Sequence, residues 1–89
     1  MVRVFVKHKV HDYTAWRKGY DAFDPTRKAL GVTAHAVYRA DDNPNDVTVT
    51  HEFPTVAAAQ AFAKSPELKR AMQSAGVLGE PTVWFAKKT

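Results

Sequence analysis

The pattern Val-x-Val-x-His occurs twice in this chain and constrains the fold more than any other feature. Its two copies are Val4–His8 and Val47–His51. Both lie in runs where β-branched residues alternate with polar ones, which is typical of a strand with one buried face. Because side chains at positions i, i+2 and i+4 of a strand point to one side, each copy presents two valines and a histidine on the same face. What packs against that face then decides the fold and the function.

The size and composition of the chain restrict its class. Eighty-nine residues predict one domain, residues 1–89, with one core. The absence of cysteine fits a reducing compartment, and we expect the cytoplasm. The first ten residues contain no continuous apolar stretch and no segment is long enough to span a bilayer, so we expect neither a signal peptide nor a membrane partner. The 13 Lys and Arg residues, against 9 Asp and Glu, are scattered along the chain, so a nucleic-acid partner is not expected.

The first strand is expected over residues 2–10, followed by a long helix that reaches about Leu30. Asp12 is placed to cap this helix and Gly31 to end it. Pro25 removes a backbone donor, so the helix should kink or restart there, with Asp24 as a second cap. Its apolar stripe has helical spacing and comprises Tyr13, Trp16, Tyr20, Phe23 and Leu30.

The second half of the chain predicts a hairpin, two helices and a last strand. Thr55 and the pair Ser65-Pro66 are the expected helix starts, since Thr and Ser cap helices and Pro suits a first helical position. In order, we expect a strand over 32–40, a turn over 41–45, a strand over 46–53, helices over 56–64 and 66–75, and a strand over 81–87.

The element order β-α-β-β-α-β predicts an α+β fold, a ferredoxin-like sandwich with an antiparallel four-stranded sheet. From right-handed crossovers we expect strands 2–10 and 46–53 to be central neighbours, and to run parallel to each other. His8 and His51 would then lie at the same end of this pair. If Val37 pairs with Val49 across the hairpin, His35 falls opposite His51 on the same face.

Taken together, these segments resemble the dimeric α+β barrel proteins, especially the small antibiotic-biosynthesis-monooxygenase-like and "cyclase"-labelled domains. The resemblance covers nearly the whole chain. It rests on Gly31 before the second strand, the hairpin Tyr38–Asn45, the strand Val47–Phe53 and the alanine-rich helix that ends in Ser65–Leu68. One departure is that many relatives carry Glu-x-Trp at the end of the third strand. Here that stretch reads His51-Glu52-Phe53, so the tryptophan is missing and the acid faces the other side.

The resemblance implies a homodimer that dimerises into an α+β barrel through the uncovered sheet face, with a ligand pocket between sheet and helices. A small hydrophobic or aromatic ligand and no cofactor are expected. Exposed aromatic side chains on the uncovered face support the same dimer, because a monomer would leave them in water. The residues expected to face the barrel are Phe5, Tyr38, Thr48, Thr50 and Trp84.

The candidate catalytic residues are His8, His51 and His35. A neutral imidazole near pH 7 can take or give a proton, which suits acid–base work on a phenol, enol or carbonyl compound. The structural alternative is that these side chains are hydrogen-bonded groups at the rim of the sheet. Three imidazoles can also hold a metal, but no HxH or HxxxH pair and no suitably placed carboxylate accompanies them, so no metal is expected. His11 lies in a connecting turn and is expected to be exposed.

Four further residues are assigned to substrate binding: Arg27, Trp16, Tyr20 and Phe53. Arg27 lies inside the apolar stripe of the first helix. Its side chain either extends along the surface to water or places a charge at the pocket mouth, where it would bind an anionic or enolate oxygen. Trp16 and Tyr20 are either core residues or the flat walls of a pocket for an aromatic ligand.

Two hypotheses about function follow. The first is a small homodimeric enzyme that oxygenates, isomerises or cyclises a planar hydrophobic, polyketide- or quinone-like molecule without a cofactor, with His8 and His51 transferring protons. The second is a non-catalytic ligand-binding or stress-associated dimer in which the histidines only satisfy the rim. The fold does not choose between them, because this architecture carries many functions.

Overall fold

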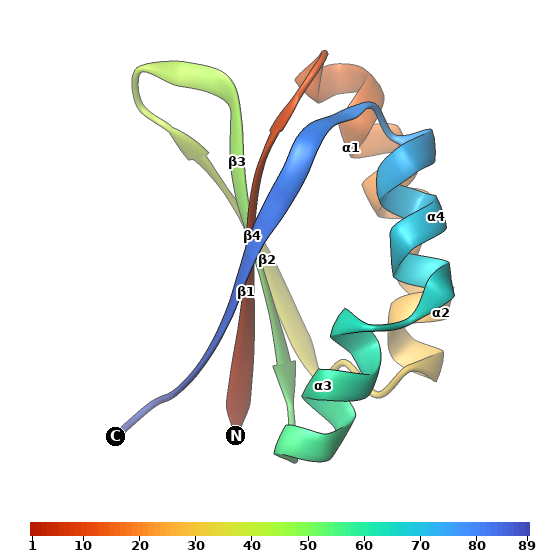
Figure 1. Cartoon of the computed structure of the whole chain (residues 1–89), viewed down its shortest axis with the longest axis vertical. Coiled ribbons are helices and arrows are strands. Elements are labelled where there is room, and N and C mark those ends of the chain that lie inside the picture. The colour runs from red at the N-terminus through yellow and green to blue at the C-terminus, as the bar shows by residue number, and fades with distance from the viewer.

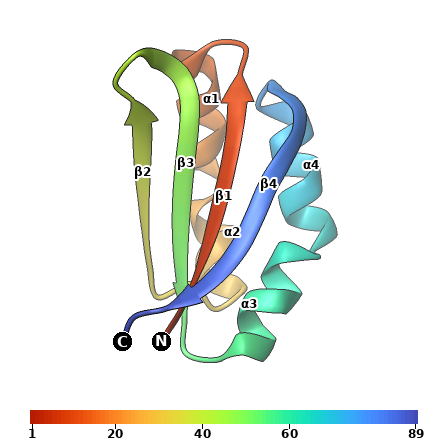
Figure 2. The same ribbon diagram turned by 60° about the vertical axis from the view of Figure 1, so that its left-hand side comes forward.

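All four helices cover one face of a four-stranded sheet, and the other face is uncovered (Figure 1). The computed structural model describes all residues, Met1–Thr89. Both chain ends lie at the same end of the sheet (Figures 1 and 2). No helix is long and apolar enough to cross a membrane. In order, the elements are β1 (Val2–Val10), α1 (Tyr13–Ala22), α2 (Asp24–Ala29), β2 (Ala34–Ala40), β3 (Asn43–Phe53), α3 (Val56–Ala63), α4 (Pro66–Ser74) and β4 (Val77–Lys87).

The strand order is β2-β3-β1-β4, and every neighbouring pair is antiparallel (Figure 2). This confirms the ferredoxin-like α+β fold and its antiparallel sheet. The expected parallel pairing of the two central strands is wrong. The crossover through α1 and α2 makes β1 parallel to β2, which is not its neighbour, and the hairpin then reverses the chain, so β3 runs opposite to β1.

The antiparallel pairing changes where two of the candidate histidines lie. His8 is opposite Val47, and His51 is opposite Val4. Both therefore project from the helix-covered face, as expected, but from opposite ends of the valine pairs. The four residues that separate Val47 from His51 correspond to roughly 13 Å along the strand. The expectation that the two histidines share one end of the sheet is wrong for this reason.

The register of the hairpin agrees with the sequence. Val37 pairs with Val49, and His35 lies opposite His51. Since side chains directly opposite each other in a sheet point to the same face, the two imidazoles are neighbours, with ring centroids 6.2 Å apart. The prediction that His35 joins His51 is confirmed.

The core lies between the central strands and the helices and consists of two clusters. The larger joins valines of β1 to Phe53 and Phe62, whose ring centroids are 5.1 Å apart. The smaller joins Trp16 and Tyr20 of α1 to Val47 and Val49 of β3. The alternating valines of the repeated pattern thus supply the floor of both clusters, because a period of two places them all on one face.

The first long helix breaks at Phe23, as Pro25 predicts. Phe23 occupies the N-cap position of α2 without a side-chain cap, and Asp24 is the first helical residue. The expectation that Asp24 caps the second helix is therefore wrong. Its carboxylate instead contacts Lys28 and Arg27 of its own helix and His35 of β2.

Three strands begin at other residues than the sequence predicts. β4 begins at Val77 instead of residue 81, because Val77 and Leu78 already pair with Val10 and Lys9 of β1, and a bulge opposite the segment between Lys7 and Lys9 follows in its first half. Gly79 has a φ of 70°, a conformation that glycine adopts without steric cost. The strands expected to begin at residues 32 and 46 begin at 34 and 43.

The predicted helix caps are present. Asp12 accepts from the backbone N–H of Ala15 at 3.1 Å, and Thr55 accepts from that of Ala58 at 3.2 Å. Ser65 Oγ makes two contacts: it accepts from the backbone N–H of Leu68 at 3.2 Å and donates to the Phe62 carbonyl at 2.8 Å. Ser65 therefore joins the end of α3 to the start of α4.

Replacing this serine tests its contribution to stability. Ser65→Ala removes both hydrogen bonds at a buried position, and we expect the free energy of unfolding to fall by about 1–2 kcal/mol. Urea unfolding followed by circular dichroism measures the change. Ser74→Ala, at the exposed last position of α4, is the matched control and should change the value by less than about 0.5 kcal/mol. Equal effects of the two substitutions would contradict the assigned cap.

Candidate functional site

A cavity of about 40 Å³ lies between the sheet and helices α1 and α4. Val6 and Val49, which pair across the central strands, form its floor, and the residues at its two ends include His8 and His51. Such a volume holds about two or three water molecules. The side chains of its roof are almost all apolar and include Trp16, Tyr20, Phe23, Leu68, Met72 and Ala75.

Three polar side chains line this apolar cavity and lie almost completely inside the protein. His8, Arg27 and His51 are 6%, 2% and 3% exposed. Five of their nitrogens have no hydrogen-bond partner within the protein: both ring nitrogens of each histidine and Nε of the arginine. A buried polar atom left unpaired costs about 1–3 kcal/mol, and polar groups of water or of a bound molecule inside this cavity would give these five nitrogens partners.

Both buried histidines are neutral at pH 7. Burial, and secondarily the nearby charge of Arg27 and His35, lowers the pKa of His51 from 6.5 to about 3. Burial also lowers the pKa of His8, although the carboxylate of Asp46 opposes this shift. A neutral imidazole offers one donor and one acceptor, so each ring can bind a hydroxyl or a carbonyl oxygen.

Arg27 of α2 is the positive charge of the site. Its Nη2 donates to the Tyr20 carbonyl at 2.6 Å and lies 3.6 Å from Asp24 Oδ1. The guanidinium carbon lies 4.0 Å from the centroid of the Tyr20 ring, a cation–π contact. The alternative in which this side chain extends to water is wrong, because the Tyr20 carbonyl in the last turn of α1 and the Asp24 carboxylate hold the guanidinium inside.

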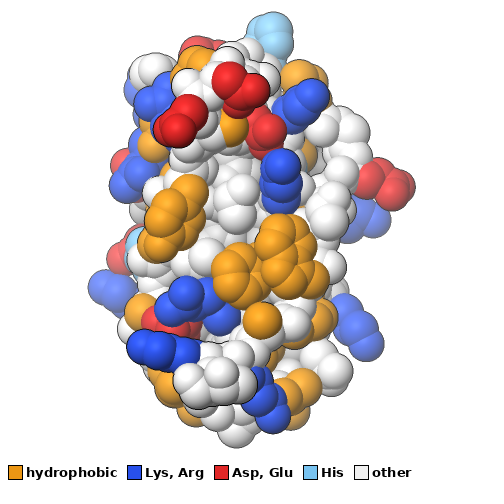
Figure 3. All heavy atoms as spheres, turned by 90° about the vertical axis from the view of Figure 1, so that its left-hand side faces the viewer, with side chains coloured by type: hydrophobic (Ala, Val, Ile, Leu, Met, Phe, Trp, Pro, Cys, Tyr) orange, Lys and Arg blue, Asp and Glu red, His pale blue; other side chains and the backbone are white.

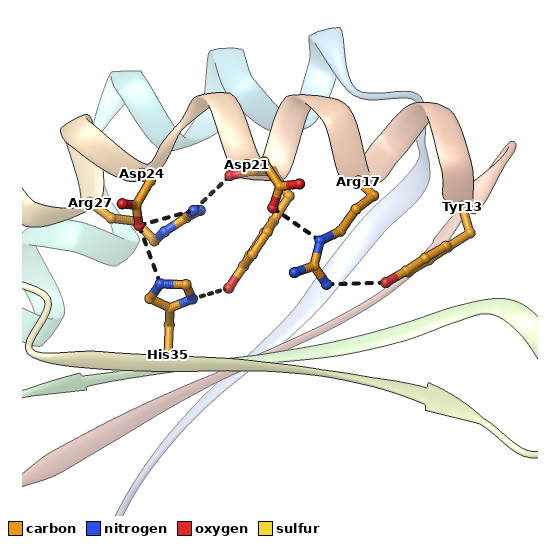
Figure 4. Close-up of polar contacts among 7 residues, drawn as sticks. Tyr13, Arg17, Asp21, Asp24, Arg27 and His35 are labelled. Carbon is orange, nitrogen blue, oxygen red and sulfur yellow. Dashed lines mark hydrogen bonds and ion pairs between the residues drawn. The ribbon is translucent and has the colours of Figure 1, made fainter.

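His35 lies between a buried phenol and a surface carboxylate. Its Nδ1 is hydrogen-bonded to the hydroxyl of Tyr20, and its Nε2 lies 3.3 Å from Asp24 Oδ1. Figure 4 shows His35 rising from its strand toward Asp24, on the side of the sheet that carries the helices, with Arg27 beside them. The side chain of His35 is about a third exposed.

The candidate residues thus divide between two ends of the cavity. One end holds His51, Arg27 and Tyr20, with His35 behind them; the ring of Tyr20 is 5.5 Å from that of His35 and 6.5 Å from that of His51. The other end holds His8, whose ring is 5.7 Å from that of Trp16. Because of this separation His8 and His51 do not face one reacting atom, whereas His51 and His35 are neighbours.

Two further positions differ from the sequence-based assignment. Phe53 is fully buried against Phe62 and does not line the cavity, since it lies one strand position beyond His51 on that face. Asp24 was not assigned to the site, because a carboxylate before a proline reads as a cap. The signal that could have placed it there is its spacing of three residues before Arg27, which puts these two side chains on one face of α2.

His11 is exposed in the turn between β1 and α1. No group of three or more His, Asp or Glu side chains lies close enough together to hold a metal ion.

Comparison with known proteins agrees with the fold that the sequence resembles. No protein-family model matches the chain, and no curated protein matches it. Among solved structures, a protein from Bordetella bronchiseptica named as a proposed antibiotic biosynthesis monooxygenase superimposes with a TM-score of 0.85 at 16% identity, covering 99% of this chain and 96% of that one. SnoaB from Streptomyces nogalater, named as a cofactor-independent oxygenase, gives 0.75 at 15% identity over 99% and 94%. A conserved protein from Methanosarcina mazei Go1 gives 0.76 at 19% identity over 99% and 92%.

These TM-scores and coverages establish a shared fold. The chain has the ferredoxin-like α+β fold of the antibiotic-biosynthesis-monooxygenase-like proteins over nearly its whole length, which confirms the resemblance seen in the sequence. Activity and substrate are separate questions, because one fold carries many functions.

The low pKa of His51 predicts how stability depends on pH. The ring stays neutral in the folded chain down to about pH 3 but takes a proton below pH 6.5 when unfolded. The unfolded state therefore binds more protons in this window, and stability falls as the pH falls. From this site alone we expect a loss of about 3 kcal/mol between pH 7 and about pH 4.

Urea unfolding at a series of pH values measures this loss. His51→Gln removes this titrating group and should make the curve shallower in that window, while the contribution of His8, whose pKa is also lowered, remains. The control is His11→Gln, which replaces an exposed histidine and should keep the wild-type slope. An unchanged slope in His51→Gln would mean that this ring does not titrate as its burial implies.

Proposed function

We propose that the chain is a homodimeric, cofactor-independent monooxygenase that acts on a planar hydrophobic molecule of polyketide- or quinone-like chemistry. The observation that carries the proposal is the set of five unpartnered nitrogens around one apolar cavity. An aromatic ring system bearing phenol, enol or carbonyl oxygens matches this lining, because its rings replace apolar contacts and its oxygens give the nitrogens partners. The similarity in fold to a protein named as a cofactor-independent oxygenase also supports the proposed activity.

His51 and Arg27 bind the substrate oxygen on which negative charge develops during the reaction. When a phenol or enol loses its proton, the negative charge on the oxygen lies beside a guanidinium and a neutral imidazole N–H, both already fixed in a dry site. Trp16 and Tyr20 supply flat walls for the rings. At the opposite end of the cavity, His8 binds a second oxygen of the substrate and transfers protons to or from it.

The proposed reaction uses dioxygen as the oxidant. An activated methylene loses a proton to give an enolate, which reacts with dioxygen at carbon. One oxygen atom becomes the new carbonyl oxygen, and the other leaves as water together with both methylene hydrogens. The carbon gives up four electrons and dioxygen takes up four, so no further reductant is needed.

Binding such a substrate requires the cavity to widen. Its volume of about 40 Å³ is smaller than a fused ring system, so side chains of the roof must move aside. Met72 and Leu68 of α4 are suited to this, since α4 is a short surface helix and an unbranched methionine adapts readily.

A non-catalytic ligand-binding dimer is the second candidate. The low pKa of His51 favours it, because an imidazole with a pKa of about 3 is a weak base near neutral pH and serves better as a hydrogen-bond partner. In that case the same residues bind the same class of molecule, but no bond of the ligand changes. The two candidates therefore differ only in turnover.

The uncovered face of the sheet is the proposed dimer interface. Phe5 and Trp84 stack there with ring centroids 5.1 Å apart, and Tyr38 is 57% exposed nearby in the sheet. Figure 3 shows apolar side chains gathered in the middle of this face, with Lys and Arg around them. Arg3 pairs with Glu52 at 2.9 Å, which neutralises one of those charges. A face of this kind buries well against a second copy of itself.

Anthrone, a tricyclic aromatic ketone with one activated methylene, tests the activity. We expect the protein to accelerate its conversion to anthraquinone with uptake of one dioxygen per molecule, followed by an oxygen electrode and by the quinone absorbance. His51→Gln and Arg27→Met should each lower turnover by about 100-fold. His8→Gln tests the end of the cavity opposite His51. An unchanged rate in the double variant His8→Gln/His51→Gln would show that neither histidine takes part in the mechanism.

The controls separate the two candidates. His11→Gln should leave the anthrone rate unchanged, because this histidine is exposed and does not line the cavity. Saturable anthrone binding in a thermal-shift titration, without oxygen uptake, would favour the ligand-binding dimer. A protein that neither binds nor converts anthrone would contradict both candidates.

The dimer is tested by light scattering at micromolar concentration. We expect twice the mass of the chain for the wild type and a monomer for Trp84→Glu, because a charge in the centre of the buried face is costly. The control is Val56→Lys, which changes an exposed apolar residue on α3, away from the uncovered face, and should remain a dimer. A wild-type monomer would contradict the proposed interface.

A further inference from the structure

We propose that Tyr20, His35 and Asp24 form a proton relay, which carries the proton released by the substrate from the cavity to the surface. The inference rests on the proposed function, since it supplies the base that the reaction needs. The three side chains come from three elements, α1, β2 and α2, and form one continuous chain of contacts. It runs from a phenol that is 7% exposed to side chains that are about a third exposed.

The contacts fix which atoms carry hydrogen. Asp24 is a carboxylate at neutral pH, because its ion pair with Lys28, and further the charges of Arg27 and His35, lower its pKa. A carboxylate only accepts, so His35 Nε2 carries a hydrogen and donates it to Asp24. If this is the only hydrogen on the ring nitrogens, Nδ1 is an acceptor and the Tyr20 hydroxyl donates to it.

This tautomer is the one that a relay requires. When the Tyr20 O–H bond breaks, the proton forms a new bond at His35 Nδ1, and the resulting imidazolium is held by the Asp24 carboxylate. The Tyr20 phenolate then takes a proton from the substrate in the cavity. His35 returns to neutrality by releasing the Nε2 proton to Asp24 or to water, so one proton has moved from the substrate to the solvent.

The charges around Tyr20 explain why the phenol needs a partner. Burial raises the pKa of Tyr20, while Arg27 and Arg17, whose guanidinium carbons lie 4.0 and 5.2 Å from its ring centroid, oppose the rise. The phenol is therefore protonated at pH 7 and does not act as a base alone. His51, buried in the same cavity, is a weak base for the reason given above. His35 is the imidazole of the cluster with both ring nitrogens engaged.

The test separates proton removal from oxygenation by using anthrone under two conditions. Under argon in D₂O, hydrogen–deuterium exchange at the methylene, followed by mass spectrometry, measures proton removal alone. In air, anthraquinone formation measures the full reaction. We expect the wild type to accelerate exchange, and Tyr20→Phe, His35→Ala and Asp24→Asn each to slow it by about 10- to 100-fold. Added imidazole should restore the rate of His35→Ala, because the position is partly open to solvent.

Matched variants guard against effects on folding. Asp21→Asn removes the exposed carboxylate that pairs with Arg17 on α1, and it should keep the wild-type exchange rate. Asp24→Glu should recover most of the rate lost in Asp24→Asn. A wild-type measurement needs no variant: the ¹⁵N shifts of the His35 ring should show hydrogen on Nε2 and an acceptor at Nδ1. The opposite tautomer would overturn the relay.

Failure of the relay and failure of the oxygenase give different results. Exchange that depends on all three residues, without quinone formation in air, supports the relay and removes the oxygenase. Quinone formation that is indifferent to the three substitutions removes the relay and keeps the oxygenase. Folded His35→Ala protein that imidazole does not restore would give His35 a purely structural role and overturn the proposal.

Discussion

The antiparallel register of β1 on β3, with Val6 opposite Val49, is the constraint on which the rest of the molecule depends. A shift of β1 by one residue in this pairing would turn its core valines and His8 to the uncovered face, since side chains alternate with a period of two, and the same shift of β3 would turn out Val47, Val49 and His51. The register also decides the direction of the two repeated patterns. The two copies of the pattern run in opposite directions, so each histidine lies opposite the first valine of the other copy. The cavity therefore has His51 at one end and His8 at the other.

Stability alone does not explain what surrounds this cavity. Valine or leucine in place of His8 and His51 would continue the apolar face of both strands and remove four of the five unpaired buried nitrogens. Small domains have little stability to spare, because they bury a limited share of their surface. A chain of 89 residues that nevertheless keeps two neutral imidazoles and a guanidinium inside gives up part of the stability of its core, and the proposed binding role accounts for this loss.

The sequence predicts those parts of the site that follow from periodicity. Alternation places the histidines of β1 and β3 on the helix-covered face, and the polar turn sets the hairpin register that brings His35 to His51. Strand direction is not visible in alternation, so the parallel central pair was expected in error. The burial of Arg27 was also not predictable from its spacing alone, because the partners that hold it, the Tyr20 carbonyl and Asp24, are created by tertiary structure at the helix break.

That helix break gives the site its polarity. The carbonyls of the last turn of α1 carry the negative end of its dipole, and that of Tyr20 accepts from the backbone N–H of Phe23 as well as from Arg27. Arg27, just beyond the break, turns back to the carbonyl of Tyr20, and this contact draws its charge under α1 and into the cavity wall. Asp24 lies between them and contacts both Arg27 and His35. The interruption at Pro25 thus collects a cation, a carboxylate and a histidine around one tyrosine, whereas the far end of the cavity, beneath the uninterrupted start of α1, holds only His8 against Trp16.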